Sequence, residues 1–253
     1  MTPDSTQSDA TRGEQEQDAI ASLREVIAPV RFVLFDFDGP ICRLFARLKA
    51  EQVAQNQVRW LAERGLHGLL TSGEREAQDP YVVLQAVNRR HPDSDLVGEL
   101  EERFTQDELE AARTAWPTPY ADPLIRTWQA VGARLAITSN NSARAVSRYL
   151  DSRGLLGCFA PHLYGRTRDL QLLKPDPYCI NRALRAMGAD PQVTLMVGDA
   201  PSDCEAARRA GVQFLGYARN DSKESRLRGA GAEYVVSSLG AVLEILRDGR
   251  QRA

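Results

Sequence analysis

The chain has 253 residues, an ordinary apolar content of 43% and a formal net charge of −2. That length accommodates one large α/β domain or a core with a smaller inserted domain. The balanced charge argues against binding to nucleic acid or to a membrane surface, and no apolar run is long enough to span a bilayer. The polar, acidic N-terminus differs from a signal peptide, so we expect a cytoplasmic protein.

Residues 1–29 are predicted to be a disordered tail followed by a short helix. The first 17 residues contain almost nothing to bury, which is typical of disorder. A helix over residues 18–28 would end before Pro29.

The segment Phe32–Phe35 predicts a buried strand that leads directly into Asp36, Asp38 and Gly39. Because residues i and i+2 of a strand point to the same side, both carboxylates can reach one point in space. Burying a carboxylate costs several kcal/mol unless a partner compensates it, and oxygen ligands suit magnesium. The pattern therefore favours a metal site, although Asp-x-Asp-Gly is also ordinary turn chemistry.

The following 70 or so residues favour helices throughout, with no clear strand. Apolar residues between Leu44 and Leu61 have the spacing of a long, partly amphipathic helix. Further helices are expected over residues 81–91, 94–104 and 106–116, and Thr105 followed by Glu108 has the spacing of a capping box. We therefore expect an all-helical insert over residues 44–118.

From residue 119 onwards, strands and helices alternate. The predicted strands are 134–138, 161–164, 193–197, 214–217 and 234–236, and the predicted helices are 122–131, 143–153, 177–187, 202–210 and 239–247. Alternation with glycine just past several helix ends favours an α/β fold with a doubly wound, parallel, Rossmann-like sheet. Such sheets bind ligands at the carboxyl ends of their strands.

Polar residues follow the predicted strands at that edge. Ser139 and Asn140 offer a hydroxyl and free amides for an anion, although Ser139, Asn140 or Ser142 could simply cap the next helix. Lys174 could balance a phosphate, or could be a solvated loop lysine. Asp199 ends a buried strand. Asp203 either adds a second carboxylate at that strand end or serves as a first-turn acid of the next helix.

Along the chain, the polar groups come in the order acid pair, hydroxyl, lysine and second acid pair. In this order the chain resembles the haloacid dehalogenase-like superfamily of hydrolases. The resemblance covers Phe32–Gly39 and roughly residues 121–236, and the stretch from Lys174-Pro-Asp-Pro to Ala210-Gly211 is specific to it. It implies a catalytic core of residues 30–43 and 119–253. The insert at 44–118 matches the position of the family's helical cap.

The resemblance also implies the roles of the acidic residues. Asp36 would be the nucleophile that forms an aspartyl-phosphate, and Asp38 the general acid and then the general base. Magnesium would be held by Asp36, Asp199 and the backbone carbonyl of Asp38, with Asp203 in or near its shell. An acid at position 38 favours phosphate esters, because family members that release halide lack it.

Ser139, Asn140 and Lys174 would then hold the phosphoryl oxygens.

Two residues depart from the family pattern. Pro40 stands where the family usually has threonine or valine, and Arg43 stands where many relatives have an acid or a small polar residue. Proline would stiffen the segment that leads to the cap.

The leading hypothesis is a magnesium-dependent phosphatase that acts on a small phosphorylated metabolite, nearest to the phosphoglycolate phosphatases. A phosphomutase of the same superfamily and a catalytically silent binding protein on this fold are the alternatives. Arg43 and Arg47 are four residues apart, so a helix would place them on one face. There they would favour a substrate with a second anionic group, unless they form only a solvated face.

Overall fold

The structure, a computed structural model, describes residue 18 and residues 20–251. The disordered tail predicted over residues 1–17 lies outside the described residues. Residues 20–27 are helical, as expected, and the helix ends before Pro29. Within the described part of the chain, no helix is both long and apolar enough to cross a membrane.

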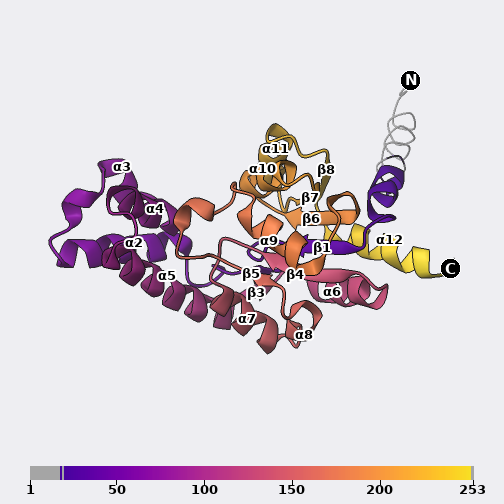
Figure 1. Ribbon diagram of the computed structural model, residues 1–253, viewed down its shortest axis with the longest axis horizontal. Coiled ribbons are helices and arrows are strands. Elements are labelled where there is room, and N and C mark those ends of the chain that lie inside the picture. The colour runs from indigo at the N-terminus through magenta and orange to yellow at the C-terminus, as the bar shows by residue number, and fades with distance from the viewer. Residues whose placement is uncertain (1–17, 19, 252–253) are drawn as a thin grey trace, which may run out of the picture.

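The core is a parallel sheet, which has six strands among the described residues (Figure 1). In sheet order the strands are β5 (Leu163–Tyr164), β4 (Arg134–Thr138), β1 (Phe32–Phe35), β6 (Thr194–Gly198), β7 (Gln213–Tyr217) and β8 (Tyr234–Val236). Phe35 pairs with Ile137 on one side and Val197 on the other, so these three strands end level. The residues that follow them therefore leave the sheet at one edge.

Helices cover both faces of the sheet. One face is packed by α6 (Ala121–Ala130), α7 (Ala143–Ser152), α8 (Leu156–Phe159) and α12 (Leu239–Gln251), and the other by α9 (Tyr178–Met187), α10 (Pro201–Arg209) and α11 (Asp221–Gly229). Val33 and Phe35 pack on the first face, and Leu34 packs on the second. Both faces of β1 are therefore buried, which is why its sequence is continuously apolar. The predicted doubly wound α/β fold is confirmed.

The remaining helices form a separate lobe at one end of the molecule, away from α12 (Figure 1). They are α2 (Ala50–Glu63), α3 (Ser72–Arg75), α4 (Pro80–Arg90) and α5 (Asp95–Thr114), joined by the short turn η1 (His67–Leu69). Helices α2, α4 and α5 share a hydrophobic cluster into which Leu170, in η2 (Leu170–Leu172), and the following Leu173 also pack. A further short turn, η3 (Pro191–Val193), precedes β6.

The chain enters and leaves this helical lobe through a short antiparallel ribbon. Its strands are β2 (Cys42–Arg43) and β3 (Trp116–Pro117). The hydroxyl of Thr118 also donates a 2.5 Å hydrogen bond to the carbonyl of Gly39. The division into a core and a cap at residues 43/44 and 118/119 stays a prediction.

The predicted helix over residues 44–61 is wrong at its start. Residues 44–48 form turns and bends, Lys49 is extended, and α2 begins only at Ala50. The amide of Leu44 donates to the carboxylate of Asp38 at 2.8 Å, and the buried Leu44 side chain belongs to the core rather than to the lobe. A tertiary contact thus outweighs the helical spacing of the apolar residues.

The predicted break between residues 104 and 106 is also wrong, because α5 continues through it. Thr105 caps no helix. Its hydroxyl donates to Glu101 at 2.9 Å and accepts from Arg166 at 3.0 Å. The helix begins at Ser94, whose side chain accepts a hydrogen bond from the amide of Val97. Residues spaced i, i+3 also face one another inside a helix, so the capping pattern was not diagnostic.

Candidate active site

Acidic side chains from two loops meet at the carboxyl edge of the sheet. Asp36 follows β1, Asp199 follows β6, and Asp203 lies in the first turn of α10. One carboxylate oxygen from each lies within 4.8 Å of the others, and all three residues are buried. Carboxylates this close repel one another strongly unless a cation balances them. Oxygen ligands in this arrangement fit a hard divalent cation such as magnesium.

Two glycines allow this close approach. Gly39 has a φ of 124°, and a methyl group on it would collide with the carboxylate of Asp199. A methyl group on Gly198 would collide with the side chain of Asp203. Any residue with a side chain at either position would push the acids apart.

Lys174 lies inside this acidic cluster. Its ammonium is 2.9 Å from Asp36 Oδ1 and 2.5 Å from Asp203 Oδ1, and it donates to the carbonyl of Thr138 at 2.9 Å. Burial lowers the pKa of Lys174, but the charges of Asp203 and Asp36 outweigh burial and raise it above its ordinary value. The lysine is therefore charged at neutral pH and is not a solvated loop residue.

Asp203 organises the turn that presents Asp199. Its second oxygen accepts hydrogen bonds from the backbone amides of Asp199 and Ala200, each 3.1 Å long. Burial raises the pKa of Asp203 to about 6, against the opposing charge of Lys174. Asp203 therefore acts both as a first-turn acid of α10 and as a member of the cluster.

Asp38 lies beside the cluster but is not one of its three carboxylates. Burial raises the pKa of Asp38 to about 6, the charge of Asp36 adds to the shift, and the hydrogen bond from Leu44 opposes it. A carboxyl group with a pKa near neutral can both give and take a proton. This is the property that a general acid and base needs.

The loop after β4 supplies polar groups to the same edge. The hydroxyl of Ser139 lies 3.0 Å from Asn141 Oδ1, and the side chain of Asn140 bonds to the backbone of Lys174 at 2.8 and 3.2 Å. Neither Ser139 nor Asn140 caps α7, because Ser142 does so. The backbone amide of Asn140 donates no hydrogen bond to another described residue.

These groups line a cavity of about 380 Å³, which we call the acidic cavity. It contains all of the predicted core residues, which are Asp36, Asp38, Ser139, Asn140, Lys174, Asp199 and Asp203. The helical lobe contributes Asp79, Tyr81 and Gln85 from the start of α4. Sequence reasoning missed these three, because nothing in a helix start indicates what it will face.

A second cavity of about 260 Å³, the basic cavity, shares Asp38 and Asp199 with the first. Its cationic lining residues are Arg43, Lys49, Arg219 and Lys223. Lys223 also forms an ion pair with Asp199. Sequence reasoning missed Lys49, Arg219 and Lys223, because only the fold brings Arg219 and Lys223 beside the segment that carries Arg43 and Lys49.

The grouping of Arg43 with Arg47 on one helical face is wrong. Arg43 lies in β2 with its guanidinium 5.2 Å from the ring centre of Trp116, and Arg47 is exposed in a bend. Arg43 lines the basic cavity, whereas Arg47 lines neither cavity. A strand and a bend direct side chains differently from a helix, so the four-residue spacing carries no meaning here.

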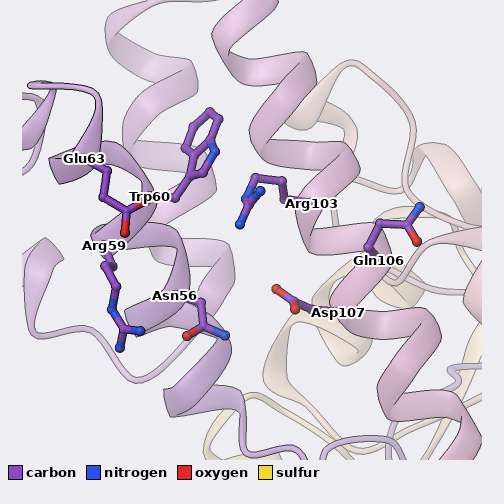
Figure 2. Close-up of a pocket in the computed structure, with 7 residues that line it drawn as sticks. All are labelled: Asn56, Arg59, Trp60, Glu63, Arg103, Gln106 and Asp107. Carbon is purple, nitrogen blue, oxygen red and sulfur yellow. The ribbon is translucent and has the colours of Figure 1, made fainter.

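A hollow of about 320 Å³ elsewhere in the helical lobe contains none of these residues (Figure 2). It lies between α2 and α5 and is lined by Arg59, Glu63, Arg103 and Asp107, among others. The ring of Trp60 lies 4.0 Å from the guanidinium of Arg64 and 5.4 Å from that of Arg103. The mixed charges of this hollow are typical of an ordinary surface between two helices.

The chain matches the sequence profile of the haloacid dehalogenase-like hydrolases over residues 30–211. It belongs to this family. The match includes both the sheet edge that carries the acidic cluster and the helical lobe that faces it.

Several proteins of similar sequence are named as phosphatases or pyrophosphatases. Phosphoglycolate phosphatase from Aquifex aeolicus is 28% identical over 209 residues, 77% of this chain and 89% of that protein. Pyrophosphatase PpaX from Halalkalibacterium halodurans is 29% identical over 48% of this chain and 56% of its own. Phosphoglycolate phosphatase from Pseudomonas putida is 30% identical over a region that spans 47% of this chain and only 43% of that protein.

Solved structures share the fold. A predicted phosphoglycolate phosphatase from Haemophilus somnus superposes with a TM-score of 0.64 at 17% identity, covering 86% of this chain and 98% of the other. CbbY from Rhodobacter sphaeroides, solved with xylulose-1,5-bisphosphate, gives a TM-score of 0.62 at 18% identity and covers 83% and 94%. At these identities the likeness concerns the fold alone.

Proposed function

We propose that this protein is a magnesium-dependent phosphatase that hydrolyses a small phosphorylated metabolite through an aspartyl-phosphate. The observation that carries the proposal is the buried cluster of Asp36, Asp199 and Asp203 with the ammonium of Lys174. A phosphate dianion repels a carboxylate nucleophile, so positive charge has to neutralise the site first. Magnesium held by Asp36, Asp199 and the carbonyl of Asp38 would supply that charge, with Asp203 close by.

In the first half-reaction, an oxygen of Asp36 bonds to phosphorus while the bond from phosphorus to the leaving oxygen breaks. Asp38 gives its proton to that oxygen, and Lys174 and the Ser139–Asn140 loop hold the phosphoryl oxygens. In the second, the carboxylate of Asp38 takes a proton from a water that attacks phosphorus, which releases phosphate and regenerates Asp36. The raised pKa of Asp38 suits it to both steps.

The basic cavity supports a substrate with a second anionic group. It adjoins Asp38, beside which the leaving oxygen must lie, and it is lined by Arg43 together with three further cations. Curated relatives are named for phosphoglycolate and pyrophosphate, both of which carry a second anion.

We also propose that residues 44–118 form a cap over a core of 30–43 and 119–253, and that the enzyme works in the cytoplasm.

Phosphate release from p-nitrophenyl phosphate tests the reaction. We expect turnover in magnesium, none in excess chelator, and inhibition by calcium, whose looser coordination would misplace Asp36. Asp199→Ala should raise the magnesium concentration needed for half-maximal rate by an order of magnitude or more, and Asp203→Ala should do so less. Full activity in chelator would contradict the metal assignment, and transfer of the phosphoryl group to a sugar instead of water would indicate a phosphomutase.

Arg43→Ala tests the substrate class. We expect it to raise KM for 2-phosphoglycolate about tenfold or more and to change KM for 2-hydroxyethyl phosphate, which lacks the carboxylate, by less than twofold. Arg47→Ala is the matched comparison, and it should change neither value because Arg47 lines neither cavity. Equal effects of Arg43→Ala on both esters would refute its specificity role and leave the phosphatase assignment standing.

A further inference from the structure

A buried ion pair joins the helical lobe to the core. Glu108 lies on α5, and Arg166 lies in the loop that follows β5. Both side chains are 0% exposed, and the guanidinium meets the carboxylate through two hydrogen bonds of 2.8 and 3.1 Å. Arg166 also stacks 4.5 Å from the ring centre of Phe104. The proposed mechanism assigns neither residue a role.

Glu108 reaches the loop that carries Ser139. Its carboxylate accepts hydrogen bonds from the side-chain amide of Asn141 at 2.9 Å and from the backbone amide of Ser142 at 3.1 Å. The first of these bonds fixes which way the Asn141 amide points. Asn141 in turn bonds to the hydroxyl of Ser139 through both its side chain and its backbone, at 3.0 and 3.2 Å. Glu108 therefore holds the Ser139 oxygen in place through one intermediate residue.

Arg166 reaches the other end of the same loop. It donates to the carbonyl of Asn140 at 3.0 Å and to the carboxylate of Glu101 at 2.9 Å. The side chain of Asn140 then pairs with the backbone of Lys174. A second chain of contacts thus runs from Arg166 through Asn140 to the lysine in the acidic cluster.

We propose that Glu108 and Arg166 are positioning residues that hold Ser139, Asn140 and Lys174 in the arrangement that binds the phosphoryl group. The proposal rests on the proposed function, and it adds a contribution of α5 to the chemistry of the core. A buried ion pair is weak as a source of stability, because two apolar residues of similar size often pack as well. The pair instead supplies directed hydrogen bonds to the loop, which an apolar pair cannot make.

The consequence is that the lobe is part of the phosphate site. Tyr81 of α4 also bonds to Glu108, at 3.4 Å, and it lines the acidic cavity. Any motion that separated α5 from α7 would release the Ser139–Asn141 loop as well.

The test separates positioning from stability. The double variant E108L/R166M replaces the pair by apolar side chains and leaves no buried charge unpaired, so it should fold. Its melting temperature should nevertheless fall, because the buried amides of Asn141 and Ser142 lose their acceptor. We expect kcat for p-nitrophenyl phosphate to fall about 100-fold, because small misplacements of binding groups have effects of this size. The inhibition constant of vanadate, a transition-state mimic, should rise at least tenfold, while KM changes less than kcat.

The matched control is E102Q/R144Q. Glu102 and Arg144 also join α5 to α7, at 2.8 Å, but they are exposed and do not touch the loop. This control should keep kcat and vanadate inhibition within twofold of the wild type. Activity of E108L/R166M within twofold of the wild type, in a folded protein, would overturn the proposal.

A third variant covers the case in which the double variant fails to fold. Arg166→Lys keeps the charge opposite Glu108 but has no fork to reach Asn140 as well. It should lower kcat at least tenfold, and an unchanged kcat would overturn the proposal. If the wild type hydrolyses no phosphate ester, the proposed function is wrong. Calorimetric binding of inorganic phosphate to wild type and variants would then decide the positioning role by itself.

Discussion

The acidic cluster at the sheet edge and the Glu108–Arg166 pair are both buried and charged, yet they are built differently. In the cluster, the carboxylates of Asp36, Asp199 and Asp203 outnumber the ammonium groups of Lys174 and Lys223 that pair with them. In the pair, the buried carboxylate of Glu108 meets the buried guanidinium of Arg166, which also bonds to the part-exposed Glu101, and these contacts are directed hydrogen bonds. The first arrangement gains from an added cation, whereas the second already contains its cation.

The difference shows how a buried charge can serve function in two ways. An excess of one sign creates affinity for a ligand of the other sign, at a cost in stability while the ligand is absent. A balanced pair attracts no ligand, but it fixes the geometry of the groups around it. Replacing an acid by its amide should therefore have opposite effects on stability in the two places.

The largest effect is expected from Asp36→Asn. The change is nearly isosteric, but it removes the proposed nucleophile and one metal ligand, so turnover should fall by at least about 1000-fold, or about 4 kcal/mol. Because it also relieves repulsion within the cluster, the melting temperature without metal should rise. Phosphate release and thermal unfolding measure the two parts. A variant free of wild-type enzyme that kept a tenth of the activity would contradict the covalent mechanism.

Glu108→Gln should act in the opposite direction on stability. It leaves Arg166 buried without its full counter-charge, so the free energy of unfolding should fall by about 3–5 kcal/mol. Glu102→Gln removes an exposed pair between the same two helices and should cost less than about 1 kcal/mol. Urea unfolding of both variants measures the difference. Equal losses would show that burial adds nothing to the Glu108–Arg166 pair.

The smallest of these effects on stability concerns Asp38 and depends on pH. Burial raises the pKa of Asp38 to about 6 from an ordinary value of 3.8, so the folded state favours the protonated form. This contribution to stability is complete below pH 4 and is lost as the pH rises through 6. Asp38→Asn mimics the protonated form, so without metal it should be up to about 3 kcal/mol more stable than the wild type at pH 8.

At pH 4 the Asp38→Asn variant and the wild type should be equally stable, because the wild-type carboxyl is then protonated as well. Urea unfolding at both pH values gives the comparison. A gain that did not change with pH would show that the cost of burying the ionised carboxylate of Asp38 is not its source. Activity of the variant should nevertheless fall by about 10²–10⁴-fold, the usual contribution of a general acid and base.

One sequence pattern appears twice in the helical lobe with different outcomes. Thr71 and Glu74 form a true capping box at the start of α3, with hydrogen bonds of 2.8 and 3.3 Å. Thr105 and Glu108 have the same spacing, but they lie inside α5 and face Arg166. Local sequence cannot separate these cases, because the deciding partner lies 58 residues further along the chain.

The sequence by itself determined most strands of the parallel sheet, the order of the polar clusters and the sheet edge where they meet, but not the ribbon of β2 and β3. Phe32–Phe35 and Arg134–Thr138 were predicted with the bounds that the structure has, because apolar runs ending in polar residues are local signals. Only the tertiary structure decided that Asp79 and Tyr81 face the acidic cavity. It alone also decided that Arg43 joins Lys49, Arg219 and Lys223, and that Glu108 meets Arg166. These partners come from elements whose relative placement depends on packing, which no periodicity records.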